Sequence, residues 1–229
     1  METLPELNYD ELRPTRDYLQ DVAKVLGRLQ QAFLAPSPRD WQYGLEVTMR
    51  GIATQTFELN GQPARALIDL VRHKIRFGDR AWPLRQTPPA QLFSDIQSML
   101  DVKLGEPEFS DGILEYDQEQ ADNYSAALWW LERRFASLKD DIHEGVTSPI
   151  LLYPHHFDLS LVWFPHDDER QLAIGFSTGD ETVAEPYIYR TAYPETTEFK
   201  NQNLLYSELR TDPRPDQLLA DFATIYFKK

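Results

Sequence analysis

The chain has 229 residues, of which 41% are hydrophobic and 12% aromatic, a composition typical of a globular protein that can bury a sizeable core. It contains no cysteine, which excludes disulfides, thiolate nucleophiles and cysteine-based metal sites. The formal net charge of −14 argues against nucleic acids and anionic membranes as partners, because their phosphates require a basic surface.

The sequence also predicts a cytoplasmic location. No apolar run approaches the roughly 20 residues that a membrane-spanning helix needs. The acidic segment 1–14 lacks the basic and apolar regions of a secretory signal. We therefore expect neither a membrane nor a nucleic acid among the partners.

The charge is distributed unevenly along the chain. Residues 1–110 contain 13 basic and 15 acidic residues, whereas residues 111–229 contain 10 basic and 22 acidic residues. Within the first half, segment 65–85 carries six basic side chains against Asp69 and Asp79. Three interpretations are open: two halves packed with complementary potential, solvated hairpin edges on which Lys and Arg discourage edge-to-edge pairing, or a site where arginines bind a small anion such as a carboxylate or phosphate ester.

The first half predicts a helix, a strand meander and a second helix. Apolar residues recur at three- and four-residue steps over 14–34, with Pro14 in the first turn. Alternating residues then predict strands over 43–50, 52–59, 64–71, 73–77 and 80–85, and Asn60-Gly61 is a strong hairpin signal. Thr87 is expected to cap a helix whose apolar stripe runs from Leu92 to Leu100.

The second half repeats this order. Glycine and proline interrupt segment 104–116, which we interpret as the boundary between two lobes. A long amphipathic helix is predicted over 117–138, and a final helix over 216–227. Between them the sequence predicts strands near 148–153, 156–164, 171–176 and 186–191.

The predicted fold class is α+β, with antiparallel sheets and helices packed on one face. The expectation is a single compact domain over 1–229, with lobes 1–110 and 111–229. Because both lobes run helix, strands, helix, they raise the question of a pseudo-repeat, but the identity between them is too low to show a duplication.

The segment 148–164, SPILLYPHHFDLSLVWF, places ionisable groups in an apolar run. Side chains alternate along a strand, so His156, Asp158 and Ser160 share one face, while His155 shares the other with Phe157. Three interpretations are open: a metal site completed by a ligand from 166–168, a catalytic His–Asp pair, or an Asp158 paired with an arginine. We assign no metal, and the cofactor is left unknown.

A second aspartate on an apolar strand, Asp69, lies inside the basic segment. Because a buried carboxylate needs a partner, we expect an ion pair, with Arg65 and Arg76 as candidates. These three residues are also candidate ligand-binding residues. His73 follows as a turn residue and as an alternative catalytic partner for the candidate catalytic Asp158.

Tyrosines alternate along the segment 185–195, and Tyr187 and Tyr189 are candidate ligand-binding residues. One face of tyrosines suits core packing or a platform for a ring-bearing ligand. The nearby Glu181 and Glu185 are considered as a general acid and base. Neither Ser148 nor Ser160 lies in a nucleophile-elbow motif, which argues against acyl transfer.

The order of several segments resembles a bacterial family known only as a domain of unknown function. The segments are LPELNYDELRPTRDYLQ, Trp41 followed by LEVTMRG, IDLVRHKI, Ser148-Pro149, Phe157-Asp158-Leu159, Gly175-Phe176 and the tyrosine segment 186–194. The resemblance extends over nearly the whole chain and implies no activity. The histidines 155 and 156 depart from the family pattern, which favours Asp158, Asp69 and His73.

The sequence does not specify a function. Our leading hypothesis is a cytoplasmic module that binds a small molecule, an anionic ligand or a protein partner in a cleft between the halves, lined by Trp and Tyr and edged by arginines. The alternative is a hydrolase that uses Asp158 with His156 or His73, with or without a divalent metal. A third option is an interaction protein whose acidic second half recruits a basic partner.

Overall fold

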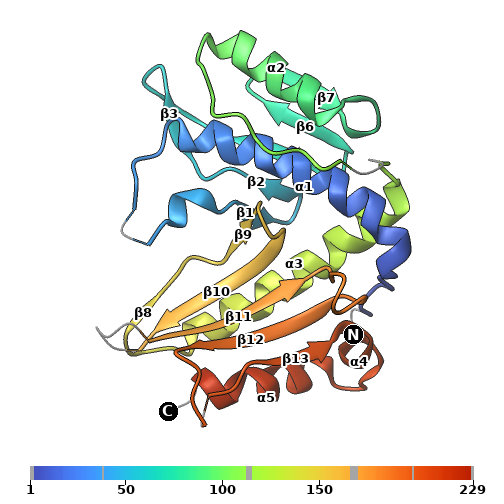
Figure 1. Cartoon of the computed structure of the whole chain (residues 1–229), viewed down its shortest axis with the longest axis vertical. Helices are drawn as coiled ribbons and strands as arrows, with labels where there is room; N and C mark the ends of the chain where they lie inside the picture. Colours follow the sequence, from blue (N-terminus) through green and yellow to red (C-terminus); the bar gives the residue numbers. More distant parts are fainter. Residues whose placement is uncertain (1–2, 38, 112–114, 166–169, 198, 228–229) are drawn as a thin grey trace.

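The computed structural model describes residues 3–37, 39–111, 115–165, 170–197 and 199–227, and its architecture is α+β. Two antiparallel sheets lie one above the other in Figure 1, and the long helix α1 (Tyr9–Gln31) runs across the upper one. One continuous cluster of buried apolar residues extends through both halves of the chain. The predicted fold class is confirmed, whereas the pseudo-repeat is not.

The upper sheet has the order β1-β2-β5-β6-β7, and a separate hairpin pairs β3 with β4. The strands are β1 (Glu46–Thr48), β2 (Gly51–Ala53), β3 (Phe57–Leu59), β4 (Gln62–Ala64), β5 (Ala66–Asp69), β6 (Lys74–Phe77) and β7 (Arg80–Pro83). Short 3₁₀ turns, η1 (Trp41–Tyr43) and η2 (Leu84–Gln86), flank the sheet. Helix α2 (Pro89–Leu100) follows and packs on α1.

The lower sheet has six strands and belongs to the second half of the chain. Its path is β13-β12-β11-β10-β8, with β9 also paired to β10. The strands are β8 (Val146–Thr147), β9 (Leu151–Tyr153), β10 (Asp158–Phe164), β11 (Gln171–Ser177), β12 (Tyr187–Tyr193) and β13 (Gln202–Leu205). Helix α3 (Gln118–Asp140) packs on β10, and α4 (Tyr206–Thr211) and α5 (Pro215–Phe227) follow at the end of the chain.

The lower sheet buries one face and leaves the other without a helix over it. Alternate residues of β10, Leu159, Leu161 and Trp163, are buried on the side of α3, as their spacing predicts. Figure 1 shows β10, β11 and β12 in front of α3, with no helix covering their near face. Asp158 and Ser160, which alternate with these apolar residues, therefore lie on the side of the sheet that no described helix covers.

Several predicted element boundaries are wrong, and side-chain hydrogen bonds explain them. Helix α1 begins five residues before Pro14, because Asn8 Oδ1 accepts hydrogen bonds from the N–H groups of Asp10 and Glu11. Thr87 does not cap α2; its hydroxyl donates to the carbonyl of Pro83 instead. The Asn60-Gly61 hairpin is confirmed, with positive φ angles of 53° and 74°.

The predicted strands are also shorter than expected in places. The strand expected over 52–59 is divided between β2 and β3, which belong to different sheets. Strands β8 and β13 and helix α4 were not predicted. No helix in the described ranges has the length and apolar character needed to cross a membrane.

Candidate functional site

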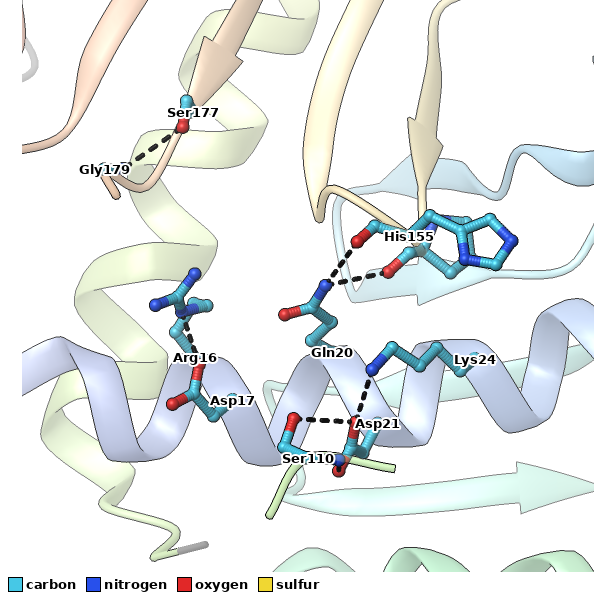
Figure 2. Close-up of polar contacts among 10 residues, drawn as sticks. Arg16, Asp17, Gln20, Asp21, Lys24, Ser110, His155, Ser177 and Gly179 are labelled. Atoms are coloured by element: carbon cyan, nitrogen blue, oxygen red, sulfur yellow. Dashed lines mark hydrogen bonds and ion pairs between the residues drawn. The ribbon is translucent and has the colours of Figure 1, made fainter. Parts of the chain in front are cut away.

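The turn between β9 and β10 carries both histidines and leads directly into Asp158. Gln20 of α1 holds this turn, because its side-chain amide donates to the carbonyls of Pro154 at 3.1 Å and His155 at 2.7 Å (Figure 2). Phe157 closes the turn with a positive φ of 55° and a buried ring. A helix of the first half thus positions a candidate site of the second half.

The next turns of α1 are fixed by a buried carboxylate. Asp21 has no exposed surface, and it accepts hydrogen bonds from Lys24 at 2.8 Å and from the backbone N–H of Ser110 at 2.9 Å. Lys24 also donates to the carbonyl of Glu108. Figure 2 shows the contacts of Asp21 with Lys24 and Ser110; together with the Glu108 contact they hold the irregular segment near residue 110 against the helix. The buried charge is satisfied locally and has a structural role.

A network of buried glutamine side chains attaches η1 to α1. The Gln30 amide donates to the carbonyls of Gln42 and Gly44, both at 2.8 Å, and its oxygen accepts from the N–H of Gln55. The Gln55 amide in turn donates to the carbonyl of Trp41. This network places Tyr43, at the end of η1, beside α1 and the β9–β10 turn.

A cavity of about 600 Å³ opens between these elements. It lies between α1 and η1 of the first half and β9 and β10 of the second half. Its lining residues are Arg28, Gln31, Asp40, Tyr43, Tyr153, His155, His156, Asp158 and Ser160. A smaller hollow of about 210 Å³ shares four of these residues and extends toward Lys24 and Glu108. We call the two hollows together the interlobe cleft.

The predicted polar face of β10 therefore lies in the cleft. Asp158 and Ser160 line it, as the strand alternation suggested, and His156 lines it from the turn before the strand. His155 also lines the cleft, because the chain turns over 154–157 and the histidine does not share the buried face with Phe157. The aromatic lining residues are tyrosines; among the described tryptophans, Trp130 and Trp163 are buried in the core.

Asp158 is the most strongly perturbed acid of the cleft. It accepts a short hydrogen bond from the hydroxyl of Tyr189, which reaches it from β12. Gly175 of β11 makes this possible, because a Cβ at that position would lie 2.2 Å from the Tyr189 ring. Burial raises the pKa of the Asp158 carboxyl, while the Tyr189 hydrogen bond and the charge of His156 lower it by smaller amounts.

The pKa values of Tyr153 and Tyr189 are both affected by the Asp158 carboxylate. Burial raises the pKa of Tyr153, and the charges of Asp158 and Asp40 raise it further. Burial also raises the pKa of Tyr189 well above its usual value, again with Asp158 as an additional cause. Tyr153 in the cleft and Tyr189 beside it are therefore phenols that stay protonated near an acid with a raised pKa, and the Tyr189 hydroxyl donates to that acid.

Two buried polar atoms near this acid lack hydrogen-bond partners within the described residues. One is Asp158 Oδ1, and the other is the hydroxyl of Tyr124, whose ring stacks on Phe157 at a centroid distance of 5.5 Å. Burial raises the pKa of Tyr124, with the charge of Asp158 as a further cause. Arg16 acts in the opposite direction, and its side chain leaves α1 on the side of α3 and the segment from Ser177 to Gly179 (Figure 2).

His73 is placed in a different environment from Asp158. It is a turn residue, as predicted, and its φ of 50° confirms the tight turn. Its Nδ1 lies 2.8 Å from the hydroxyl of Tyr116, and its Nε2 lies 3.7 Å from Asp122. It has no hydrogen bond or ion pair with Asp158 or His156, so the structure does not assemble this version of the catalytic pair.

The predicted ligand-binding residues of the first half gather on the upper sheet. Asp69 forms an ion pair, but its partner is Arg50 rather than Arg65 or Arg76. Arg50 reaches it because β2 pairs with β5 and brings Gly51 opposite Asp69. Arg65 pairs instead with Glu46. Both Arg65 and Arg76 line a groove of about 460 Å³ on this sheet, which shares no lining residue with the cleft.

The remaining candidates divide between the cleft and other contacts. Tyr189 contacts Asp158, whereas the Tyr187 hydroxyl donates to Asp180 at 3.1 Å on an exposed loop. The prediction that Asp158 pairs with an arginine is wrong, since its partner is Tyr189. Glu185 accepts from the backbone N–H of Ser207. Ser148 is buried and accepts from the N–H of Val162, a structural contact.

Sequence reasoning missed the cleft residues Arg28, Tyr43 and Tyr153, and it missed Gln20, which holds the turn beside the cleft. Gln20 and Arg28 belong to the polar side of a helix whose apolar periodicity was recognised, so their eight-residue spacing was available as a signal. Tyr43 gave no signal, because its position depends on the long-range glutamine network. The chain order alone does not bring residues near 43 and 153 together.

The described residues contain no group of three or more acidic, histidine or cysteine side chains arranged to hold a metal ion. The residues 166–168, which were considered as additional ligands, lie outside the described residues. The cleft itself offers His156 and Asp158 as neighbouring metal-ligand types.

Comparison with known proteins adds one match. No curated protein and no solved structure matches the chain. Residues 4–110, just under half of the chain, match the model of a family described as "Family of unknown function (DUF5996)". The matched segment contains α1, η1 and the upper sheet, but it stops before Asp158, so the resemblance stated for the second half stays a prediction.

Proposed function

We propose that the protein binds a small organic molecule in the interlobe cleft and acts in the cytoplasm. The observation that carries this proposal is a cavity of about 600 Å³ that joins Tyr43 and Arg28 of the first half to Tyr153 and Asp158 of the second. Ligand sites are concave, contain aromatic surface and include a few polar groups that fix orientation. The cleft has this composition and lies where two parts of the fold meet.

The lining residues indicate the chemistry of the ligand. Arg28 and the two histidines offer donors for an anionic group, and the tyrosine rings offer apolar surface for a ring. Asp158, whose pKa is raised and whose Oδ1 has no hydrogen-bond partner in the described part of the chain, can share a proton with a polar group of the ligand. The favoured ligand is a ring-bearing organic acid with at least one further polar substituent.

Native mass spectrometry of untagged protein, purified without chelators, tests the proposal. We expect a mass above that of the denatured chain, and we expect Tyr43→Ala to lose it while the fold is retained. Tyr193→Ala is the matched control, because that ring is 62% exposed and does not line the cleft. An added mass that persists in Tyr43→Ala would place the ligand elsewhere.

If the wild-type chain carries no added mass, a thermal-shift series tests weaker binding. The probes are benzoate, 4-hydroxybenzoate and benzyl alcohol, which differ in charge and in polar substituents. We expect the hydroxyacid to raise the melting temperature most, and Arg28→Gln to abolish the difference between the acid and the alcohol. Equal melting temperatures with all three probes would contradict the proposed ligand chemistry.

A second candidate function is hydrolysis by Asp158 with His156. The observation that favours it is that both residues line the same cavity and that the charge of His156 acts on the Asp158 carboxyl. An acid with a raised pKa beside a histidine can supply general acid and base catalysis near neutral pH. The version with His73 has no contact to support it.

Assays with p-nitrophenyl acetate and p-nitrophenyl phosphate, with and without added divalent metal, test the hydrolase. We expect any activity to be lost in Asp158→Asn and strongly reduced in His156→Ala, while His73→Ala retains it. The loss of activity supports a catalytic role only if the melting temperature of Asp158→Asn stays at or above that of the wild type, because unfolding would also remove activity. Activity that survives Asp158→Asn would exclude this acid as the catalytic group.

A further inference from the structure

The upper sheet carries a groove on the face opposite to its buried core. Ile52, Ile68 and Ile75 stand opposite one another in register and are fully buried. The adjacent row, Ala53, Leu67 and Arg76, is also in register and therefore points to the other face. This second row crosses the groove of about 460 Å³.

The lining of the groove combines cationic and apolar groups. It contains three arginines and no acidic residue; the full lining is Thr48, Met49, Arg50, Ala53, Arg65, Leu67, Arg76, Phe77 and Gly78. In a chain with a net charge of −14, this concentration of positive charge is a local exception. Met49 is 70% exposed and adds apolar surface at the rim.

The three guanidinium groups differ in how they are held. Arg50 is oriented by Asp69, whose carboxylate is fully buried and also accepts from the N–H of Arg72 at 3.2 Å. Arg65 is held by the half-exposed Glu46. Arg76 has no ion pair within the ranges that the structure describes. Arg50 and Arg65 use Nη2 for these contacts, so other N–H groups of each fork remain available for an acceptor.

We propose that this groove binds a small organic anion with an apolar tail or ring. The oxyanion, a carboxylate or a phosphate ester, is held by Arg76 together with the free N–H groups of Arg50 and Arg65. The hydrocarbon part lies on Leu67 and Met49 and covers apolar surface that is exposed in the unbound protein. The role of Asp69 is then to position Arg50, and the site is independent of the interlobe cleft.

Isothermal titration calorimetry with octanoate, octyl phosphate and inorganic phosphate tests this site. We expect octyl phosphate or octanoate to bind more tightly than inorganic phosphate, with an affinity that falls as salt is raised. The stronger of the two organic ligands distinguishes a carboxylate from a phosphate ester. We expect Arg76→Gln to weaken binding at least about tenfold, because a charge-assisted hydrogen-bonded contact is lost.

Two variants separate the charged and apolar parts of the site. Arg80→Gln removes an exposed arginine that does not line the groove, and it should change the affinity less than about twofold. Leu67→Ser should weaken octyl phosphate but leave the affinity for inorganic phosphate unchanged. The melting temperature of Arg76→Gln should equal that of the wild type, since the exposed side chain makes no ion pair within the described part of the chain.

Three results would overturn the proposal. Octanoate and octyl phosphate that do not bind at millimolar concentration would show that the groove is not a site. Equal losses in Arg76→Gln and Arg80→Gln would show a general effect of positive charge. Inorganic phosphate that binds as tightly as octyl phosphate would contradict the role of the apolar surface.

Discussion

Asp69 and Asp158 look alike in the sequence, since each interrupts an apolar strand, but their environments differ. Asp69 is fully buried, forms an ion pair with Arg50 and accepts a backbone hydrogen bond. Asp158 lines a cavity and, among the residues that the structure describes, has a tyrosine hydroxyl as its side-chain partner and one oxygen without a hydrogen bond. The comparison shows that an aspartate with complete partners stabilises the fold, whereas an incompletely partnered one is available to a ligand.

The largest expected effect is the loss of the Asp69 ion pair. Asp69→Asn removes the charge opposite Arg50 and should destabilise the protein by about 3 kcal/mol, near the lower end for breaking a buried pair because Arg50 stays partly solvated. Urea denaturation gives this free energy. Glu46→Gln, which breaks the exposed pair with Arg65, is the matched control and should cost less than about 1 kcal/mol.

The next effect concerns Tyr189, the hydrogen-bond donor to Asp158. Tyr189→Phe removes the donated hydrogen bond and should cost about 1–3 kcal/mol at pH 7, because a buried carboxylate oxygen loses its donor. Since this hydrogen bond lowers the pKa of Asp158, the pKa should rise further in the variant, which an NMR titration measures. Tyr187→Phe, whose hydroxyl contacts the exposed Asp180, should leave the Asp158 titration nearly unchanged.

Asp158→Asn should change stability with the opposite sign from Asp69→Asn. Burial raises the pKa of Asp158 in the folded state, so the folded protein binds the carboxyl proton more tightly than the unfolded chain does. The free energy of unfolding of the wild type therefore falls as pH rises from the pKa of the unfolded chain through the pKa of the folded protein. The neutral amide avoids this loss, and we expect a gain on the order of 1 kcal/mol at pH 7. The melting temperatures of the wild type and Asp158→Asn should converge below pH 4. A lower melting temperature of the variant at pH 7 would show that Asp158 stabilises the fold, as Asp69 does.

The smallest effect concerns the Tyr124 hydroxyl, which is buried without a hydrogen-bond partner in the described structure. If no solvent molecule or ligand satisfies it, Tyr124→Phe should stabilise the protein by up to about 1 kcal/mol, because an unsatisfied buried group is removed. A lower melting temperature would show that the hydroxyl has a bound partner near Asp158. Thermal denaturation at pH 7 measures the sign directly.

The helices and the hairpin show how local chemistry sets local structure. Apolar periodicity predicted α1, α2, α3 and α5, and the Asn60-Gly61 turn was predicted because both residues accept positive φ angles. The start of α1 was wrong, since the capping oxygen of Asn8 lies before the apolar stripe. The break between β2 and β3 was not predicted, because separation into two sheets depends on pairing with distant strands.

The candidate site was predicted only in part, because local patterns place residues on a strand face but do not show which strands pair. Strand alternation correctly placed Asp158 and Ser160 on one face, because that pattern is a property of a single strand, whereas His156 reaches the same cleft from the turn before the strand. The partner of Asp69 was wrong because antiparallel pairing brings Arg50, rather than its sequence neighbours, opposite the acid. Tyr189 could be named from its segment, but its contact with Asp158 requires the glycine on the intervening strand.

The sequence by itself determined the α+β class, the main helices, the acidic charge with its local basic segment, and the face on which Asp158 lies. Each of these depends on residues close together in the chain. The tertiary structure decided which arginine neutralises Asp69, which tyrosine reaches Asp158, and that α1 and η1 meet the β9–β10 turn in a cleft. These outcomes depend on contacts between different elements of the fold, from Arg50 with Asp69 across neighbouring strands to Gln20 with His155 across the two halves, which no local pattern encodes.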